Sequence, residues 1–166
     1  MEKSTQNFLS VIENHKGIIY KVAGLYTKDS EDRKDLEQEI IFQLWRSFER
    51  YDEQYKLSTW IYRISLNVSI SFYRKEKHRE TISHPLSGEV FSVHEEENIL
   101  SEDVKLLQQF IKELKELDRA IIVLTLDGNS QKETAEILGL TETNVSTRVN
   151  RIKAQLKKKF ETVKNQ

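Results

Sequence analysis

The chain has 166 residues and a formal net charge of −1; 32% of the residues are charged and 37% are hydrophobic. It contains no cysteine, which excludes disulfides, thiolate metal sites and thiol catalysis. It has no apolar run near membrane-spanning length and no apolar core of a secretion signal, so we expect a cytoplasmic protein without membrane insertion. One proline, five glycines and almost no alternation of apolar with polar residues predict an all-α fold.

The near-neutral total charge is an average over blocks of opposite sign. Residues 63–79 carry a net charge of +4 and residues 142–166 a net charge of +5, whereas residues 86–104 carry −6. The local potential, more than the total charge, steers a protein to nucleic acid. The two basic segments therefore predict two nucleic-acid surfaces with an acidic segment between them.

A small domain of three helices is predicted at residues 1–80. Apolar residues place the first helix at about residues 5–26, and Asp29 or the serine after it is expected to cap the second. Ser58 is expected to cap the third helix, with a kink or break near residues 67–71, because serine and asparagine side chains compete for backbone hydrogen bonds. The second helix should bury an apolar stripe formed by Leu36, Ile40 and Leu44.

An acidic linker is predicted at residues 81–100, which contain the only proline of the chain. A second small helical domain is predicted at residues 101–166. Its first two helices are expected to be capped by Ser101 and Asp118, and the second of them should end at residues 127–128.

A helix-turn-helix is predicted at residues 130–159. Ser130 and Glu133 have the spacing of a capping box, and Gly139 suits the left-handed residue that ends a helix. Thr141 is expected to cap the second helix, whose polar and basic remainder suits a DNA major groove. The buried stripe of that helix is predicted to be Val145, Val149, Ile152 and Leu156.

Three short motifs resemble the motifs of one family. Residues 35–42 read DLEQEIIF, which is similar to the pattern D-L-x-Q-E-x-x-F, and residues 58–67 read STWIYRISLN, which is similar to W-L-x-x-I-x-x-N. Residues 143–148 read TNVSTR, which is similar to G-T-V-K/R-S/T-R, except that Ser146 stands at a usually basic position. Together these motifs resemble the sigma-70 family of bacterial RNA polymerase sigma factors, in its extracytoplasmic-function group.

The resemblance implies partners and residue roles. The expected partners are core RNA polymerase, promoter DNA and, as a further candidate, an anti-sigma factor. Docking on the polymerase is expected of Asp35, Gln38, Glu39 and Gln43. Opening of the minus-ten DNA is expected of Arg63, Asn67, Ser71, Tyr73, Arg74, Lys75 and Lys77. Binding of the minus-thirty-five duplex by the recognition helix is expected of Thr143, Asn144, Ser146, Thr147, Arg148, Asn150, Arg151 and Lys153.

Two other functions remain open from the residues alone. The chain could be a stand-alone dimeric helix-turn-helix regulator, or a helical adaptor whose basic helices meet acidic proteins. Catalysis is not expected, because the four histidines are scattered and no glycine-rich phosphate loop is present. We therefore expect no metal, no cofactor and no enzymatic activity.

Overall fold

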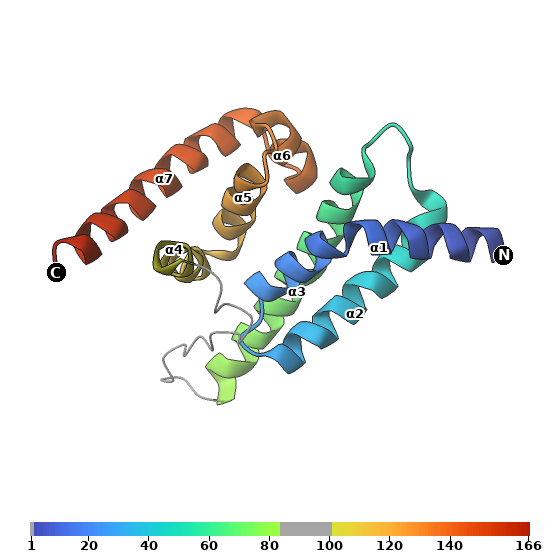
Figure 1. Cartoon of the computed structure of the whole chain (residues 1–166), viewed down its shortest axis with the longest axis horizontal. Helices are drawn as coiled ribbons and strands as arrows, with labels where there is room; N and C mark the ends of the chain where they lie inside the picture. The colour runs from blue at the N-terminus through green and yellow to red at the C-terminus, as the bar shows by residue number, and fades with distance from the viewer. Residues whose placement is uncertain (1, 84–100) are drawn as a thin grey trace. The chain divides into compact units, whose positions relative to one another are not determined.

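The computed structural model describes residues 2–83 and 101–166, and the chain divides into two compact units, residues 1–92 and 93–166. Within the described residues every regular element is a helix, which confirms the all-α prediction (Figure 1). The last helix of the first unit reaches Ser83, so the first residues of the predicted linker are helical. The rest of that linker, with its acidic run, lies outside the described residues.

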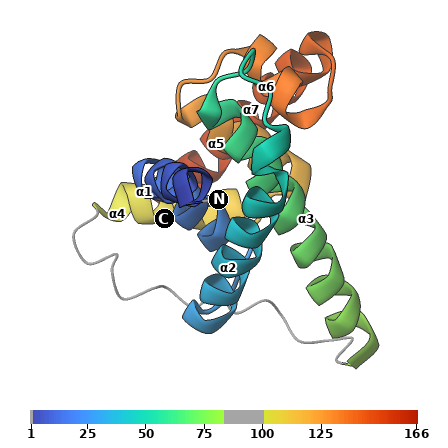
Figure 2. The ribbon, with the colours of Figure 1, turned by 90° about the vertical axis from the view of Figure 1, so that its right-hand side faces the viewer.

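The first unit is built from three long helices. They are α1 (Glu2–Leu25), α2 (Ser30–Ser47) and α3 (Leu57–Ser83), with the short 3-10 helix η1 (Phe48–Arg50) after α2. Each of the three packs on the other two, and Figure 2 shows α2 and α3 side by side. Their common core is fully buried and includes Val22, Leu36, Ile40, Leu44, Ile61 and Leu66.

Two predictions for the first unit need correction. Asp29 caps α2 as expected, accepting a bond from the backbone N–H of Asp32, but Ser58 does not cap α3. The N–H of Trp60 donates to the carbonyl of Lys56, so the helix begins at Leu57, two residues earlier than a Ser58 cap would place it, and Ser58 lies in its first turn. The predicted break near residues 67–71 is absent, because packing against both neighbouring helices outweighs local competition for the backbone.

The second unit contains four helices. They are α4 (Glu102–Lys112), α5 (Glu116–Leu126), α6 (Gln131–Leu138) and α7 (Glu142–Lys164). Helix α5 packs on the other three, and α7 also packs on α4 and α6. The fully buried residues of this unit include Arg119, Ala120, Ile121, Leu124, Thr134, Val145 and Ile152.

The turn between α4 and α5 is held by an arginine. Arg119 is 1% exposed, and its Nη2 donates to the carbonyls of Lys112 and Leu114, at 2.6 and 3.0 Å. The prediction that Asp118 caps α5 is wrong, because α5 already begins at Glu116 with Lys115 as its N-cap.

The predicted helix-turn-helix is present in α6 and α7. Both bonds of the capping box between Ser130 and Glu133 form, and Gly139 adopts a left-handed conformation with φ 68°. Thr141 caps α7 by accepting a bond from the N–H of Asn144. The predicted stripe of Val145, Val149, Ile152 and Leu156 is buried.

Candidate nucleic-acid interface

The predicted DNA-reading side chains of α7 all lie off its buried stripe. Thr143, Thr147 and Asn150 are exposed and, at 100° per residue, fall on the side of the helix opposite that stripe. Ser146 and Lys153 lie on one flank of this side, whereas Arg148 and Arg151 lie on the other. The small polar groups at the outward face suit close approach to base edges in a major groove.

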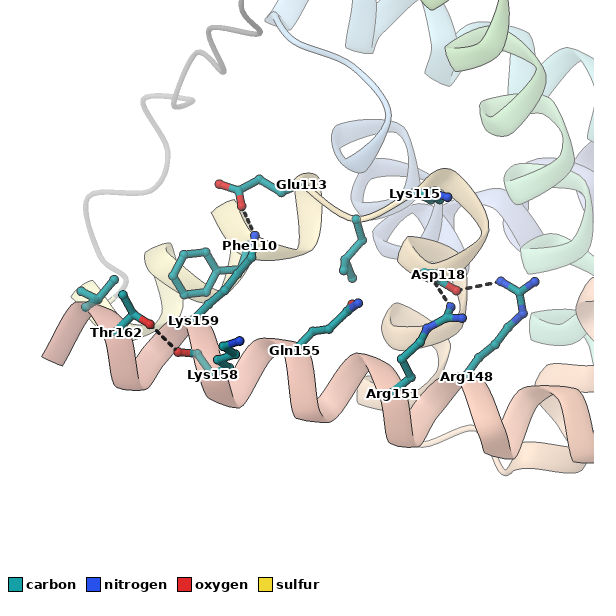
Figure 3. Close-up of a pocket in the computed structure, with 12 residues that line it drawn as sticks. Phe110, Glu113, Lys115, Asp118, Arg148, Arg151, Gln155, Lys158, Lys159 and Thr162 are labelled. Atoms are coloured by element: carbon teal, nitrogen blue, oxygen red, sulfur yellow. Dashed lines mark hydrogen bonds and ion pairs between the residues drawn. The ribbon is translucent and has the colours of Figure 1, made fainter. Parts of the chain in front are cut away.

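Arg148 and Arg151 share a carboxylate that the sequence interpretation did not assign to this site. Arg148 Nη1 lies 2.9 Å from Asp118 Oδ1, and Arg151 Nη2 lies 2.7 Å from Asp118 Oδ2 (Figure 3). Arg148 Nε also donates to Asn144 Oδ1 at 2.8 Å. Asp118 precedes these arginines by 30 and 33 residues, so no local spacing reveals the contact. The local sequence shows only that Asp118 is one of two acids in the first turn of an otherwise largely apolar helix.

Four of the predicted minus-ten residues form one stripe on α3. Arg63, Asn67, Ser71 and Arg74 are spaced by four, four and three, which places them on one helical face. Asn67, Ser71 and Arg74 are exposed, whereas Arg63 is half-buried with its guanidinium 5.4 Å from the centre of the Tyr55 ring. The basic residues after this stripe extend its charge along the helix, with Lys75, Lys77 and Arg79 exposed.

Tyr73 points away from the stripe. Its ring meets the buried Tyr26 ring edge-on, with centroids 6.0 Å apart, and Lys77 Nζ lies 5.8 Å from the centre of the Tyr73 ring. Ser65 and Ser69, two small polar residues close in sequence to Asn67 and Ser71, are fully buried on the inward side of α3. The structure therefore brings together the predicted polar and basic groups but leaves out these two serines.

The predicted docking residues share the exposed side of α2. Asp35, Gln38 and Glu39 are exposed, on the side away from the buried stripe. Gln43 is half-buried, and its Nε2 donates to Glu39 Oε1 at 2.8 Å. Phe42 lies on the same face with 52% of its surface exposed, a feature the docking prediction did not include. An exposed aromatic ring beside carboxylates is a common anchor in protein interfaces.

Acidic groups crowd the start of α2. Burial raises the pKa of Asp32 above its usual value, and the nearby carboxylates of Asp29, Glu76, Asp35 and Glu31 raise it further. Several carboxylates therefore lie close together at this end of the helix, with Lys28, Arg33 and Lys34 beside them in the sequence.

The described residues contain no group of three or more histidine and carboxylate side chains placed to hold a metal ion. None of the helices in residues 2–83 and 101–166 is long and apolar enough to cross a membrane.

Two family models match the chain, one in each unit. Residues 11–79 match the model described as Sigma-70 region 2, and residues 105–156 match the model described as Sigma-70, region 4. The first match includes all of α2 and most of α3, and the second includes all of α6 and most of α7, the two helices of the helix-turn-helix. The chain belongs to the sigma-70 family, in its extracytoplasmic-function group. It is a sigma factor for promoter-directed transcription initiation.

Known sigma factors are similar to this chain in sequence and in fold. The ECF RNA polymerase sigma factor SigW of Bacillus subtilis is 27% identical, over 92% of this chain and 88% of SigW. RNA polymerase sigma factor SigZ of the same organism is 39% identical over 66% of this chain and 61% of SigZ. The solved sigma factor RpoE of Bartonella quintana, in complex with the anti-sigma factor NepR, matches with a TM-score of 0.77 at 20% identity, covering 97% of this chain and 98% of RpoE.

Proposed function

We propose that the two units divide the work of a sigma factor between them. The first unit docks on core RNA polymerase through the exposed side of α2 and engages opened minus-ten DNA through the stripe on α3. The second unit binds the minus-thirty-five duplex through α7. The protein contributes binding energy and orients the promoter for the polymerase, and it performs no catalysis of its own. It acts in the cytoplasm, where the polymerase transcribes the chromosome.

The observation that supports this proposal is the chemical contrast between two exposed surfaces of the first unit. The exposed side of α2 presents Asp35, Gln38 and Glu39, whereas the stripe on α3 presents Asn67, Ser71 and Arg74. An acidic face with an exposed aromatic ring suits a protein partner, and a basic face with small polar groups suits DNA. A single module that bound only duplex DNA would have no use for both.

The roles of individual α3 residues follow from their chemistry. Asn67 and Ser71 offer hydrogen-bonding groups to an unstacked base. Such hydrogen bonds would offset the free energy that the base loses when it leaves its stack and its pair. Arg74, Lys75 and Lys77 are placed to bind backbone phosphates, with affinity gained from counterion release. Tyr73, which packs against Tyr26 and is half-buried, supports the helix.

An anti-sigma factor is a further expected partner. The similar fold of RpoE is solved in complex with the anti-sigma factor NepR. The carboxylates at the start of α2 and the exposed rings of Phe42 and Trp45 give this chain a surface that such an inhibitor could cover. Competition between an inhibitor and the polymerase for that surface would keep the sigma factor silent until a signal releases it.

Reconstituted transcription tests the proposal. The purified chain is mixed with core polymerase and genomic promoter fragments, and discrete transcripts that depend on the chain are expected. Tight binding to duplex DNA without polymerase, with a footprint over two half-sites about one helical turn apart, would instead support the stand-alone dimeric regulator. If the chain shows neither polymerase-dependent transcription nor duplex binding, the result would favour the helical adaptor.

A further inference from the structure

Asp118 joins two side chains of the recognition helix from outside that helix. Its side chain is 8% exposed, and each of its two oxygens accepts a bond from a different arginine, Arg148 or Arg151. The two arginines are three residues apart, so they lie next to each other on one flank of α7 (Figure 3). We propose that Asp118 is a positioning residue, which holds Arg148 and Arg151 in the orientation that contacts the upstream promoter duplex.

The arginines keep donors for DNA while Asp118 holds them. A guanidinium has five N–H donors, and each arginine gives Asp118 only one terminal nitrogen. Arg151 is 50% exposed and Arg148 is 31% exposed, so their outer edges remain in solvent. Long arginine side chains lose rotamer freedom when they bind, and here part of that loss has occurred before DNA arrives.

A purely structural role explains this arrangement less well. The structural arginine of the same region is Arg119, which is 1% exposed and bonded to two backbone carbonyls. Arg148 and Arg151 are partly exposed, so water could solvate them without Asp118. Burying the Asp118 carboxylate, by contrast, costs free energy of desolvation. Asp118 also lies in the first turn of α5, where the helix dipole favours an anion, and the experiment below separates that effect from positioning.

A carboxylate beside DNA could also act in the opposite way. If Asp118 only competed with phosphates for the arginines, removing its charge would strengthen promoter binding. Positioning predicts the reverse, because the freed guanidinium groups would have to be ordered by DNA itself. The proposal rests on the proposed role of α7 in binding the minus-thirty-five duplex.

The test is a double-mutant cycle in the full chain, bound to core polymerase. Promoter affinity is measured for the wild type, Asp118→Asn, the Arg148→Ala/Arg151→Ala pair, and the combination of all three substitutions. We expect Asp118→Asn to weaken binding about tenfold and to broaden the base preference at the upstream element. In the background that lacks both arginines, the same substitution should change affinity less than about twofold.

The matched control is Glu113→Gln. Glu113 lines the same surface pocket as Asp118, Arg148 and Arg151, and its ion-pair partner is Lys159. This substitution should leave affinity and base preference unchanged. Unchanged or stronger binding by Asp118→Asn, or an equal loss with and without the arginines, would overturn the positioning role. If Asp118→Asn fails to fold, Arg151→Lys replaces it. That variant keeps the charge but loses the planar fork, so unchanged base preference would overturn the proposal.

The wild-type measurements keep this proposal separate from the proposed function. A wild-type holoenzyme that initiates at promoters while the cycle shows no coupling overturns the positioning role alone. A wild-type chain that fails to initiate with polymerase overturns both.

Discussion

Asn67 and Glu39 are single residues whose proposed roles can be separated. Asn67 is exposed on the α3 stripe, and Glu39 is exposed on the side of α2 that is proposed to dock on the polymerase. We expect Asn67→Ala to lower the yield of open promoter complexes about tenfold, or about 1.4 kcal/mol, with little change in polymerase affinity. Glu39→Ala should weaken polymerase affinity by a similar factor, because it removes a charged group from the docking face. Open complexes are followed by reactivity of unpaired thymines, and polymerase affinity by fluorescence anisotropy. Equal effects of either substitution on both measurements would contradict the two roles.

Asp32 gives a pH-dependent prediction. Its pKa is raised in the folded chain, chiefly by burial and then by neighbouring carboxylates. The folded state therefore holds the proton more tightly than the unfolded state, and stability falls as pH rises from the unfolded pKa to the folded one. At neutral pH the ionised group lowers stability, so Asp32→Asn should raise the Tm of the first unit. The gain should shrink as pH falls below the usual carboxylate range. Thermal unfolding at pH 7 and pH 3.5 checks this, with the exposed Glu53→Gln as control; a gain of equal size at both would refute it.

At the scale of elements, two glycines make a matched pair. Gly139 ends α6 with φ 68°, where a Cβ is penalised by backbone conformation alone, because nothing lies within 4 Å of it. Gly139→Ala should therefore lower the free energy of unfolding of the second unit by about 1–2 kcal/mol. Gly17 lies inside α1, and a Cβ added there would also meet no atom of another residue within 4 Å beyond the helix's own backbone. Gly17→Ala should therefore stabilise the first unit by about 0.5–1 kcal/mol. Denaturant titration measures both, and a gain in stability from Gly139→Ala would contradict the left-handed turn.

The helix-turn-helix was predictable because its signals are local. Ser130, Glu133, Gly139 and Thr141 satisfy backbone groups within one turn of themselves, so the sequence alone indicates each contact. The predictions that failed depend on packing from elsewhere in the chain. The break in α3 is prevented by two helices that pack against it. Asp118 does not cap α5, and its side chain instead forms an ion pair with Arg148, thirty residues away.

The candidate site shows the same limit. Periodicity correctly predicted the buried stripe of α2. Asn67 and Ser71, which the family resemblance indicated, are exposed on α3. Periodicity did not show that Ser65 and Ser69 turn inward, since a serine can lie on either side of an amphipathic helix. Phe42, which is exposed on the same face of α2, was not among the predicted docking residues.

For the whole molecule, two units with separate cores should lose stability separately. Leu36 is buried in the core of the first unit, and Leu36→Ala should lower that unit's free energy of unfolding by about 2–5 kcal/mol. Hydrogen exchange in α1, α2 and α3 should then accelerate, whereas exchange in α5 and α7 should stay at the wild-type rate. Mass spectrometry of the full chain resolves the two sets of peptides. The converse control is Ile152→Ala in the core of the second unit. Acceleration in both units from either substitution would contradict independent cores.

The carboxylate shared by Arg148 and Arg151 also bears on how promoter preference can diverge among descendants of this gene. Thr147 and Asn150 are exposed on the recognition helix, so a single substitution at either position should be tolerated without a compensating change elsewhere. Loss of either arginine alone leaves the buried Asp118 carboxylate with one ion-pair partner instead of two. Loss of Asp118 frees both arginine side chains at once. These three positions should consequently be inherited as a unit, and lineages that rewire their regulons should do so first through the outward-facing residues of the helix.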